Sequence, residues 1–322
     1  MSISAKSILE GNRRSLAKAI TLIESHLPVH IQAGQQLLDQ LLPHTGNSIR
    51  IGISGIPGVG KSTFIEAFGL YLIEQGKRVA VLAVDPSSPL AGGSILGDKT
   101  RMEYLARNEN CFIRPSPTSG SLGGVAHKTR ESILLVEAAG YDVVLVETVG
   151  VGQSEYEVAG MVDFFTVLML PNAGDELQGI KKGIMELADA LLVNKADGES
   201  VQLAQMTQRH YENAFHLLRQ TSFWTPRVMP VSALENNNID AVWGMVIDYV
   251  SQAREQGSFN TKRASQNRNW LDKLIHQLLE QFLMQNSDAQ ALWPQLEQAV
   301  IDGKMTPFAA ARMIIDTLQS GR

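Results

Sequence analysis

Cysteine and positive charge are scarce in this sequence of 322 residues. The one cysteine, Cys111, excludes an intramolecular disulfide and any zinc or iron–sulfur site that needs several cysteines, and it fits a reducing compartment. The 28 Lys and Arg residues are outnumbered by 33 Asp and Glu residues, which gives a net charge of −5. This balance argues against a protein that binds nucleic acid by neutralising many phosphates.

Long apolar runs are also lacking. No run is long enough to span a bilayer. Residues 1–30 carry charges such as Lys6, Arg13 and Lys18 where a signal peptide would need an apolar core. We therefore expect a cytoplasmic protein with neither a membrane nor a nucleic acid as partner. Hydrophobic residues make up 44% of the chain and charged residues 19%, a balance that can fill a sizeable core.

The pattern of apolar residues predicts three parts: a helical extension over residues 1–47, an α/β domain over 48–255, and a helical arm over 256–322. The first helical part is expected to pack against the main domain. The arm could pack on its own core or self-associate, because helices this apolar need a partner. The stripes are Ile8, Leu9, Leu16, Ile20, Ile23, Ile31, Leu37, Leu38, Leu41 and Leu42 in the first part, and Leu271, Leu274, Ile275, Leu278, Leu279, Phe282 and Leu283 in the arm.

The stretch Gly55–Ser62 fits G-x-x-x-x-G-K-S/T, the Walker A motif or P-loop. A predicted strand precedes it and a predicted helix follows it, which is the context that the motif requires. Glycines let backbone N–H groups surround an anion, Lys61 can reach the β- and γ-phosphate oxygens, and Ser62 can offer its hydroxyl to Mg²⁺. The predicted nucleotide-binding residues here are Gly55, Ile56, Pro57, Gly58, Val59, Gly60, Lys61, Ser62 and Thr63.

Three acidic residues follow apolar or glycine-rich stretches. Asp85 ends a nearly continuous apolar run, at the edge of a parallel sheet where ligands bind, although a surface turn would use the same Asp-Pro-Ser sequence. Asp98 either enters the site on a mobile loop or caps a helix. Glu147 ends a strand in the manner of a Walker B acid that holds Mg²⁺, and Gly150 would let its N–H approach a γ-phosphate. The alternative for Glu147 is a buried strand that ends in an exposed glutamate.

A guanine-reading motif, N-K-x-D, follows a further predicted strand as Asn194, Lys195, Ala196 and Asp197. The Asp197 carboxylate only accepts hydrogen bonds, so it can take two from N1–H and the exocyclic amine of guanine, a donor pair that adenine lacks. Lys195 can lie along the base, and Asn194 can tie this loop to the P-loop. The sequence Ser232-Ala233-Leu234 matches the loop whose backbone N–H contacts guanine O6 in such proteins.

The segment Gly174–Gly183 would form an amphipathic helix without Gly179 and Gly183. A glycine inside a helix costs roughly 1 kcal/mol relative to alanine. The pattern therefore indicates either a segment kept deformable or a helix with a solvated lysine face.

The order of these motifs resembles the ArgK/MeaB family of P-loop GTPases, within the SIMIBI class of signal-recognition and metal-insertion GTPases. The resemblance covers nearly the whole chain. It rests on V-D-P-S-S-P, G-D-K-T-R-M, E-T-V-G-V-G-Q-S-E, G-D-E-L-Q-G-I-K-K-G and N-K-A-D. It implies an α/β fold with a mostly parallel sheet flanked by helices, and helical extensions at both ends. It also implies a homodimeric, GTP-hydrolysing chaperone that assists, protects or reactivates adenosylcobalamin-dependent methylmalonyl-CoA mutase.

The resemblance also assigns roles to residues. Asp85, Asp98 and Glu147 look like the acids associated with Mg²⁺, with Ser62 as a direct ligand.

Gln178 and Lys181 lie in what resembles a third switch loop, which the mutase partner reorganises toward the nucleotide, where Lys61 also acts. Val151 follows Gly150, where Ras-type proteins place their water-orienting glutamine. We therefore expect slow intrinsic hydrolysis of GTP to GDP and phosphate, accelerated when a partner orders Gln178 and Lys181. The tail of the chain resembles the dimerisation arm of the family.

Other classes of protein share parts of this pattern. An older family name, the LAO/AO transport-system kinase or ATPase, would link nucleotide hydrolysis to amino-acid transport and require a second substrate site. A metal-insertion GTPase would carry a His-rich or Cys-bearing site. A membrane-targeting GTPase would carry a Met-rich or amphipathic module, and the 11 methionines are scattered. A non-enzymatic scaffold is consistent only if nucleotide binding fails.

Overall fold

The computed structural model describes residues 3–84, 102–115, 122–148, 153–171, 182–218 and 223–320. Its contacts divide the chain into two compact units, Met1–Asn260 and Thr261–Arg322. In the first unit the described strands form one sheet of seven parallel strands in the order β3-β2-β4-β1-β5-β6-β7. The strands are β1 (Ile49–Gly55), β2 (Val79–Val84), β3 (Cys111–Arg114), β4 (Val143–Thr148), β5 (Phe164–Met169), β6 (Ala190–Val193) and β7 (Arg227–Pro230).

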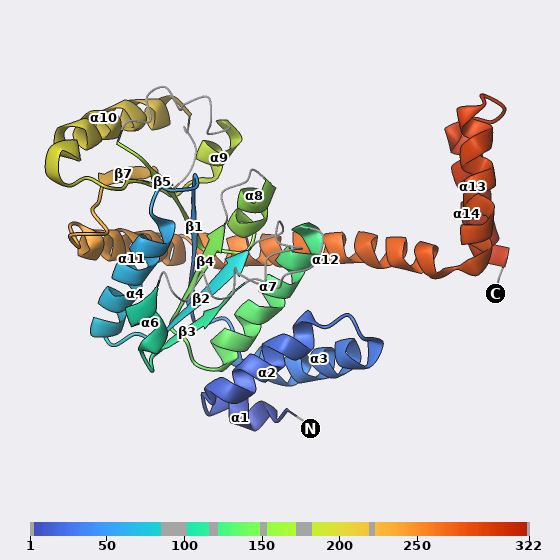
Figure 1. Cartoon of the computed structure of the whole chain (residues 1–322), viewed down its shortest axis with the longest axis horizontal. Helices are drawn as coiled ribbons and strands as arrows, with labels where there is room; N and C mark the ends of the chain where they lie inside the picture. Colours follow the sequence, from blue (N-terminus) through green and yellow to red (C-terminus); the bar gives the residue numbers. More distant parts are fainter. Residues whose placement is uncertain are drawn as a thin grey trace. The chain divides into compact units, whose positions relative to one another are not determined.

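Helices cover both faces of this sheet, which is why its central strands are apolar on both sides (Figure 1). In β4, Val144 and Val146 join one core while Val143 and Leu145 join the other. One face carries α4 (Lys61–Glu74), α6 (Glu103–Arg107) and α11 (Ile239–Glu255). The other carries α7 (Leu122–Ala138), α8 (Gln153–Ala159), α9 (Lys182–Leu187) and α10 (Val201–Leu218).

The predicted fold class is confirmed: an α/β unit with a parallel sheet between helices, and further helices at both ends. In this order β1 connects to β2 on one side of it, whereas its neighbour β5 connects to β6 on the other side. The direction of the connections therefore switches between β1 and β5. Ligands bind at such a switch point in open α/β sheets. The P-loop follows β1 directly, so the strand order places it there.

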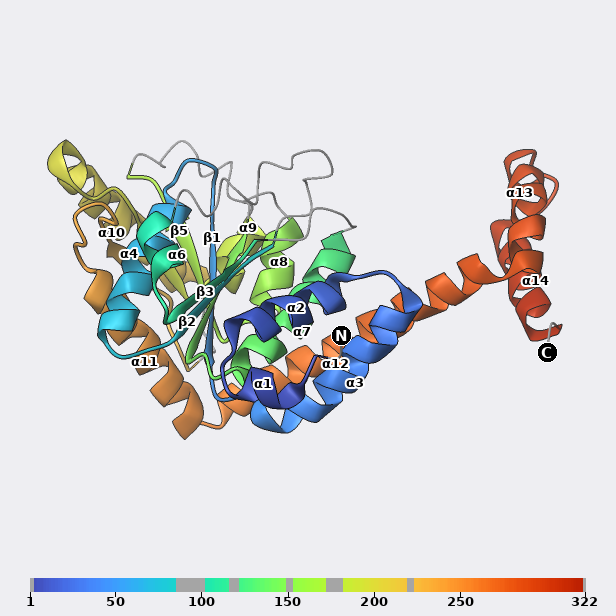
Figure 2. The same ribbon diagram turned by 60° about the horizontal axis from the view of Figure 1, so that its bottom comes forward.

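The N-terminal helices α1 (Ala5–Leu9), α2 (Arg13–Glu24) and α3 (Pro28–Leu41) pack beside α7 in both views (Figures 1 and 2). Their inward side chains belong to the same core as α7. Polar contacts reinforce this layer, because Gln35 Nε2 donates to Glu131 Oε1 at 2.5 Å. Three members of the predicted stripe, however, face outward: Leu9, Ile31 and Leu42 are 38%, 43% and 55% exposed.

Helix α12 (Ser258–Gln285) leads into the second unit, where α13 (Ser287–Ile301) and α14 (Pro307–Ser320) pack against each other. The side chain of Asn286 caps α13 by accepting a hydrogen bond from Ala289 N at 2.8 Å. The helix pair encloses a small core of Ala289, Leu296, Ala310 and Ile314. On α12, by contrast, large apolar side chains of the predicted stripe stay 57–60% exposed, namely Leu271, Leu278, Leu279 and Phe282.

Candidate nucleotide site

The loop between β1 and α4 has the backbone conformation of a phosphate cradle. Gly60 adopts a φ of +96° immediately before α4, and a Cβ there would lie 2.7 Å from Asn194 Nδ2. Gly55 adopts a φ of +151°, and a Cβ there would lie 2.7 Å from the carbonyl oxygen of Leu168. Both positions therefore require glycine, for the backbone angle and for the close approach. The first N–H groups of α4 have no acceptor within the helix, and a P-loop uses such groups to bind an anion.

The Lys61 side chain folds back onto this loop. Its Nζ donates to the carbonyl oxygens of Gly55 at 2.7 Å and Ile56 at 3.2 Å. Burial lowers the pKa of Lys61 below its ordinary value of 10.5, while the charges of Glu147 and Glu155 act in the opposite direction. Its ammonium group is thus buried, is held by carbonyl dipoles, and interacts electrostatically with two carboxylates. The carbonyl groups are weaker partners for a cation than phosphate oxygens would be.

Glu147 and Ser62 lie at the same edge of the sheet. The parallel pairing of β1 with β4 sets Glu147 opposite Ile53. Along the strand direction, this is two residues before Gly55. Thr148 anchors this end of β4 because its hydroxyl donates to Ser54 Oγ at 3.0 Å. Both Glu147 and Ser62 are half-buried. The oxygen donors that Mg²⁺ prefers are therefore available beside the P-loop.

Five predicted site residues lie outside the described residues. Asp85 follows β2 directly in the sequence, and β2 pairs with β4 as far as Val84 and Thr148. The others are Asp98, Gly150, Gln178 and Lys181.

The N-K-x-D residues follow β6 and contact the P-loop directly. Asn194 is buried, and its Nδ2 donates to the carbonyl oxygen of Val59 at 2.8 Å while its Oδ1 accepts from Ala233 N at 3.3 Å. Lys195 adopts a φ of 60° and its Nζ donates to the carbonyl oxygen of Gly58 at 2.9 Å. The predicted link from Asn194 to the P-loop is therefore present, and Lys195 provides a second one.

Asp197 and the loop after β7 form a third part of this network. The Ser232 hydroxyl donates to Asp197 Oδ2 at 2.5 Å and accepts from Glu235 N at 3.1 Å. The backbone N–H of Ser232 donates to Asn237, and that of Ala233 donates to Asn194. Leu234, the third predicted residue, is 78% exposed. The sequence predicts a contact of this loop with the base alone and gives no sign of the hydrogen bond from the Ser232 hydroxyl to Asp197.

Glu155 is a second residue that sequence reasoning missed. It lies on α8, is 3% exposed, and contributes to the electrostatic environment of Lys61. The signal was present, because Glu155 ends the E-T-V-G-V-G-Q-S-E motif. Its burial depends on how α8 packs, which the motif does not specify.

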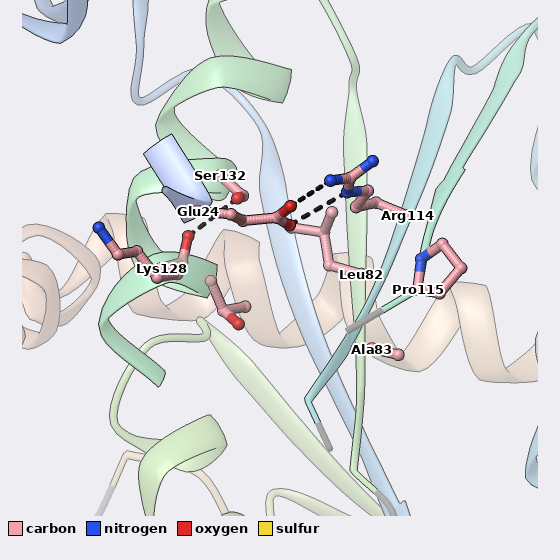
Figure 3. Close-up of a pocket in the computed structure, with 8 residues that line it drawn as sticks. Glu24, Leu82, Ala83, Arg114, Pro115, Lys128 and Ser132 are labelled. Atoms are coloured by element: carbon pink, nitrogen blue, oxygen red, sulfur yellow. Dashed lines mark hydrogen bonds and ion pairs between the residues drawn. The ribbon is translucent and has the colours of Figure 1, made fainter. Parts of the chain in front are cut away.

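A small hollow lies near the ends of β2 and β3, between α2 and α7 (Figure 3). Arg114 and Glu24 form an ion pair across it, with Nε to Oε1 at 3.0 Å. The hydroxyls of Thr129 and Ser132 donate to backbone carbonyls of α7. Its polar groups are thus engaged with the protein itself, which suits a structural joint better than a ligand site. The lining residues are Glu24, Leu82, Ala83, Arg114, Pro115, Lys128, Thr129 and Ser132.

The described residues contain no group of three or more His, Cys, Asp or Glu side chains arranged to hold a metal ion. None of their helices combines the length and the apolar character that crossing a membrane requires.

A parallel sheet, a P-loop at its switch point and an N-K-x-D loop bonded to that P-loop define a P-loop nucleoside triphosphatase of the guanine-nucleotide type. The chain belongs to the MeaB family, described as methylmalonyl Co-A mutase-associated GTPase MeaB, whose model matches residues 16–288. The resemblance inferred from the motifs is thereby confirmed, and the protein is a GTPase that hydrolyses GTP to GDP and phosphate.

The matches to similar proteins cover almost the whole chain. GTPase ArgK of Escherichia coli K12 is 48% identical over 318 residues, which cover 98% of this chain and 96% of the relative. The mouse methylmalonic aciduria type A homolog, mitochondrial, is 45% identical, and the match covers 97% of this chain and 78% of the relative. The crystal structure of an LAO/AO transport system kinase is 41% identical with a TM-score of 0.78, and the match covers 98% and 96% of the two chains.

Proposed function

We propose that this GTPase is a chaperone of adenosylcobalamin-dependent methylmalonyl-CoA mutase, which it assists, protects or reactivates according to its nucleotide state. The observation that carries the proposal is the match of residues 16–288 to a family described as associated with that mutase. The name of the mouse relative, a methylmalonic aciduria protein, supports the same metabolic context.

The proposal is tested by capturing the mutase of the same organism on the immobilised GTPase. Capture is measured without nucleotide, with GDP and with a non-hydrolysable GTP analogue, and mutase inactivation is followed with and without the GTPase. We expect capture that depends on the nucleotide and slower inactivation of the captured enzyme. A mutase that is neither captured nor protected in any nucleotide state would overturn the proposal.

For the phosphate groups, we propose that Lys61 and the backbone N–H groups of Gly55–Thr63 bind the β- and γ-phosphates. Ser62 and Glu147, together with Asp85 and Asp98, would hold Mg²⁺, and Gly150 would approach the γ-phosphate. When bound, the metal neutralises charge on the phosphate oxygens. The observation that supports this ligand set is that Ser62 and Glu147 lie at the same edge of the sheet beside the P-loop.

For the base, we propose that Asp197 accepts two hydrogen bonds from guanine while Lys195 lies along the ring and Asn194 holds the loop. The Ser232 hydroxyl orients the Asp197 carboxylate. Because the backbone N–H groups of Ser232 and Ala233 have partners within the protein, the N–H of Leu234 is our choice for guanine O6.

Hydrolysis is proposed to be slow in the isolated protein and faster with the mutase. Phosphoryl transfer to water depends on positioning and charge stabilisation. Lys61 provides charge stabilisation that does not depend on the mutase. Gln178 and Lys181 provide the groups that the mutase brings toward the nucleotide. A Lys181→Ala variant should retain intrinsic turnover and lose the stimulation by the mutase.

We infer that the protein is a cytoplasmic homodimer in which residues 256–322 form the dimerisation arm, beside a GTPase domain at 48–255 and a helical extension at 1–47. The supporting observation is the exposed apolar face of α12, formed by Leu271, Leu278, Leu279 and Phe282. Replacing Leu278 and Phe282 by glutamate should give a monomer in light scattering, with the GTP site unchanged. A variant that stays dimeric would contradict this interface.

A kinase linked to amino-acid transport is the alternative function, since the similar solved structure is described as an LAO/AO transport system kinase. Such a kinase would transfer the γ-phosphate to an acceptor other than water. The two functions are distinguished by following radiolabelled γ-phosphate from GTP. Label found only in inorganic phosphate supports the GTPase chaperone, and label found on protein supports the kinase.

A further inference from the structure

Helix α8 packs closely against strand β1. Asp163 follows this helix, and its N–H donates to the carbonyl oxygen of Arg50 at 2.9 Å, near the start of β1. Val158 lies farther along the strand, because a Cβ added to Gly52 would lie 3.0 Å from Val158 Cγ1. The glycine lets the helix approach the strand. Going back along α8 therefore means going forward along β1, toward its carboxyl end at Gly55.

This antiparallel course brings the first turn of α8 toward the P-loop. Glu155 lies three residues before Val158. This spacing is about 4.5 Å along the helix axis, and residues so spaced share a helix face. The face is the one that Val158 turns toward the sheet, and Glu155 is accordingly 3% exposed. Lys61 Nζ bonds to the carbonyl oxygens of Gly55 and Ile56, so a buried carboxylate and a buried ammonium group lie toward the same end of β1.

The buried Glu155 carboxylate needs a partner of opposite charge, because an ionised carboxylate in a protein interior is costly unless it is paired. Within the described part of the chain it accepts one long hydrogen bond, from the Ser154 hydroxyl to Oε2 at 3.4 Å. It also interacts electrostatically with Lys61, as does Glu147. Glu147 is the proposed ligand of Mg²⁺, so Glu155 is the carboxylate that remains with the lysine when the metal is bound.

We propose that Glu155 is a positioning residue for GTP hydrolysis, whose buried carboxylate holds the Lys61 ammonium group at the P-loop. Phosphates compete with the carbonyl oxygens of Gly55 and Ile56 for the ammonium protons, whereas the charge of Glu155 persists in every nucleotide state. Glu155 acts through Lys61 and touches neither the nucleotide nor the metal in this account. The inference rests on the proposed role of Lys61 at the β- and γ-phosphates.

The first test is Glu155→Gln, which keeps the shape of the side chain and removes its charge. Misplacing a catalytic group by about 1 Å can cost on the order of 100-fold in rate. We expect kcat for GTP to fall roughly 10-fold while KM changes less than about 3-fold, because the contacts to the base and the P-loop amides remain. A kcat equal to that of the wild type would overturn the inference.

Glu157→Gln is the matched control. It removes a carboxylate from the same helix, but Glu157 interacts electrostatically with Arg130 of α7. We expect its kcat to stay within about 2-fold of the wild type. A loss as large as that of Glu155→Gln would mean that any charge removed from α8 slows turnover, and would overturn the inference.

A double-mutant cycle shows whether Glu155 acts through Lys61. Single-turnover rates at saturating GTP and Mg²⁺ are compared for the wild type, Glu155→Gln, Lys61→Ala and the double variant. Without the lysine the carboxylate has nothing to position, so we expect the double variant to lie within about 2-fold of Lys61→Ala. A further loss of roughly 10-fold in the double variant would mean that Glu155 acts apart from Lys61, which would overturn the inference.

A third measurement needs neither nucleotide nor turnover. A buried ammonium group that is held in place exchanges its protons slowly with water and gives a signal in a nitrogen-edited NMR spectrum of lysine side chains. The signal of Lys61 is assigned by its loss in Lys61→Arg. We expect it in the wild type and in Glu157→Gln, and expect it to broaden or vanish in Glu155→Gln. An unchanged signal in Glu155→Gln would overturn the inference whatever the turnover.

Glu155→Asp distinguishes the charge of the side chain from its shape. It keeps the charge and withdraws it by one methylene group, so its kcat should lie between those of Glu155→Gln and the wild type. Urea unfolding of each variant shows that it is folded. An Asp variant no faster than the Gln variant would mean that shape rather than charge matters, and would overturn the inference.

The Lys61→Ala variant of the cycle tells the two failures apart. If it hydrolyses GTP at close to the wild-type rate, the proposed role of Lys61 has failed, and the NMR signal alone decides whether Glu155 holds the lysine. If Lys61→Ala is slow and Glu155→Gln is not, only the present inference has failed.

Discussion

At the proposed base-recognition end of the P-loop, formed by Asn194–Asp197 and Ser232–Leu234, the polar side chains hold one another in place. Asn194 bridges Val59 and Ala233, and the hydroxyl of Ser232 holds Asp197. At the phosphate end, formed by Lys61, Ser62 and Glu147, the lysine instead bonds to carbonyl oxygens of its own loop. The first arrangement can receive a base with little rearrangement, whereas the second must exchange its bonds when phosphates arrive.

This difference has a physical consequence for the switch. Side chains that are fixed before binding do not lose further conformational freedom on binding, so the base-recognition end can supply affinity and specificity in every nucleotide state. The phosphate end gains its strong charge-assisted bonds only when phosphate is present. Variants at the two ends should therefore differ in kind, with changes of selectivity at one end and changes of turnover at the other.

The largest effect is expected from Lys61→Ala. Removing a donor that stabilises developing charge costs roughly 100- to 1,000-fold in rate. We expect such a loss in phosphate release at saturating GTP, with and without the mutase. Binding of GDP should persist, because the base-recognition end is unchanged. Turnover close to that of the wild type would show that the phosphate end works without its lysine.

A change of base preference is expected from Asp197→Asn. The amide can accept one hydrogen bond and donate another, so it suits xanthine, which has a carbonyl where guanine has an amine. We expect the ratio of affinities for GTP and xanthosine triphosphate to change on the order of 100-fold or more. Glu199→Gln, an exposed residue just beyond the motif, is the matched control. Unchanged GTP affinity in Asp197→Asn would refute the assignment of the base-recognition end.

The contrast between the ends also marks what the sequence could predict. The P-loop and N-K-x-D follow strands with fixed spacing, so the strand order brings Asn194 to Val59 as expected. The direction of the Lys61 side chain could not be read from the motif, because it depends on which acceptors lie nearest. Nor could the burial of Glu155, which follows from how α8 packs. The same limit applies to Leu9, Ile31 and Leu42, apolar residues that face outward.

A smaller effect is expected from Asn194→Ala, which removes one bond to the P-loop, at Val59, and one bond within the base-recognition end, at Ala233. A buried group left without its partner costs about 1–3 kcal/mol, and here the carbonyl of Val59 and the N–H of Ala233 lose theirs. We expect a lower free energy of unfolding and roughly 10-fold weaker GDP binding, since 1.4 kcal/mol is tenfold in affinity. Turnover at saturating GTP should stay within a few-fold. A loss of kcat with unchanged affinity would remove the distinction between the two ends.

The smallest effect concerns the proton on Lys61. Because burial lowers the pKa of Lys61 below 10.5, the unfolded chain holds more protons than the folded one between that lowered pKa and 10.5. The contribution of Lys61 to the free energy of unfolding should therefore rise with pH across that window and be constant below it. The measurement is the difference in unfolding free energy between wild type and Lys61→Met as the pH is raised toward 10.5. Phosphate oxygens favour the charged lysine, so bound GDP should weaken or reverse the rise of this free-energy difference with pH. The same pH dependence with and without GDP would mean that Lys61 does not contact the nucleotide.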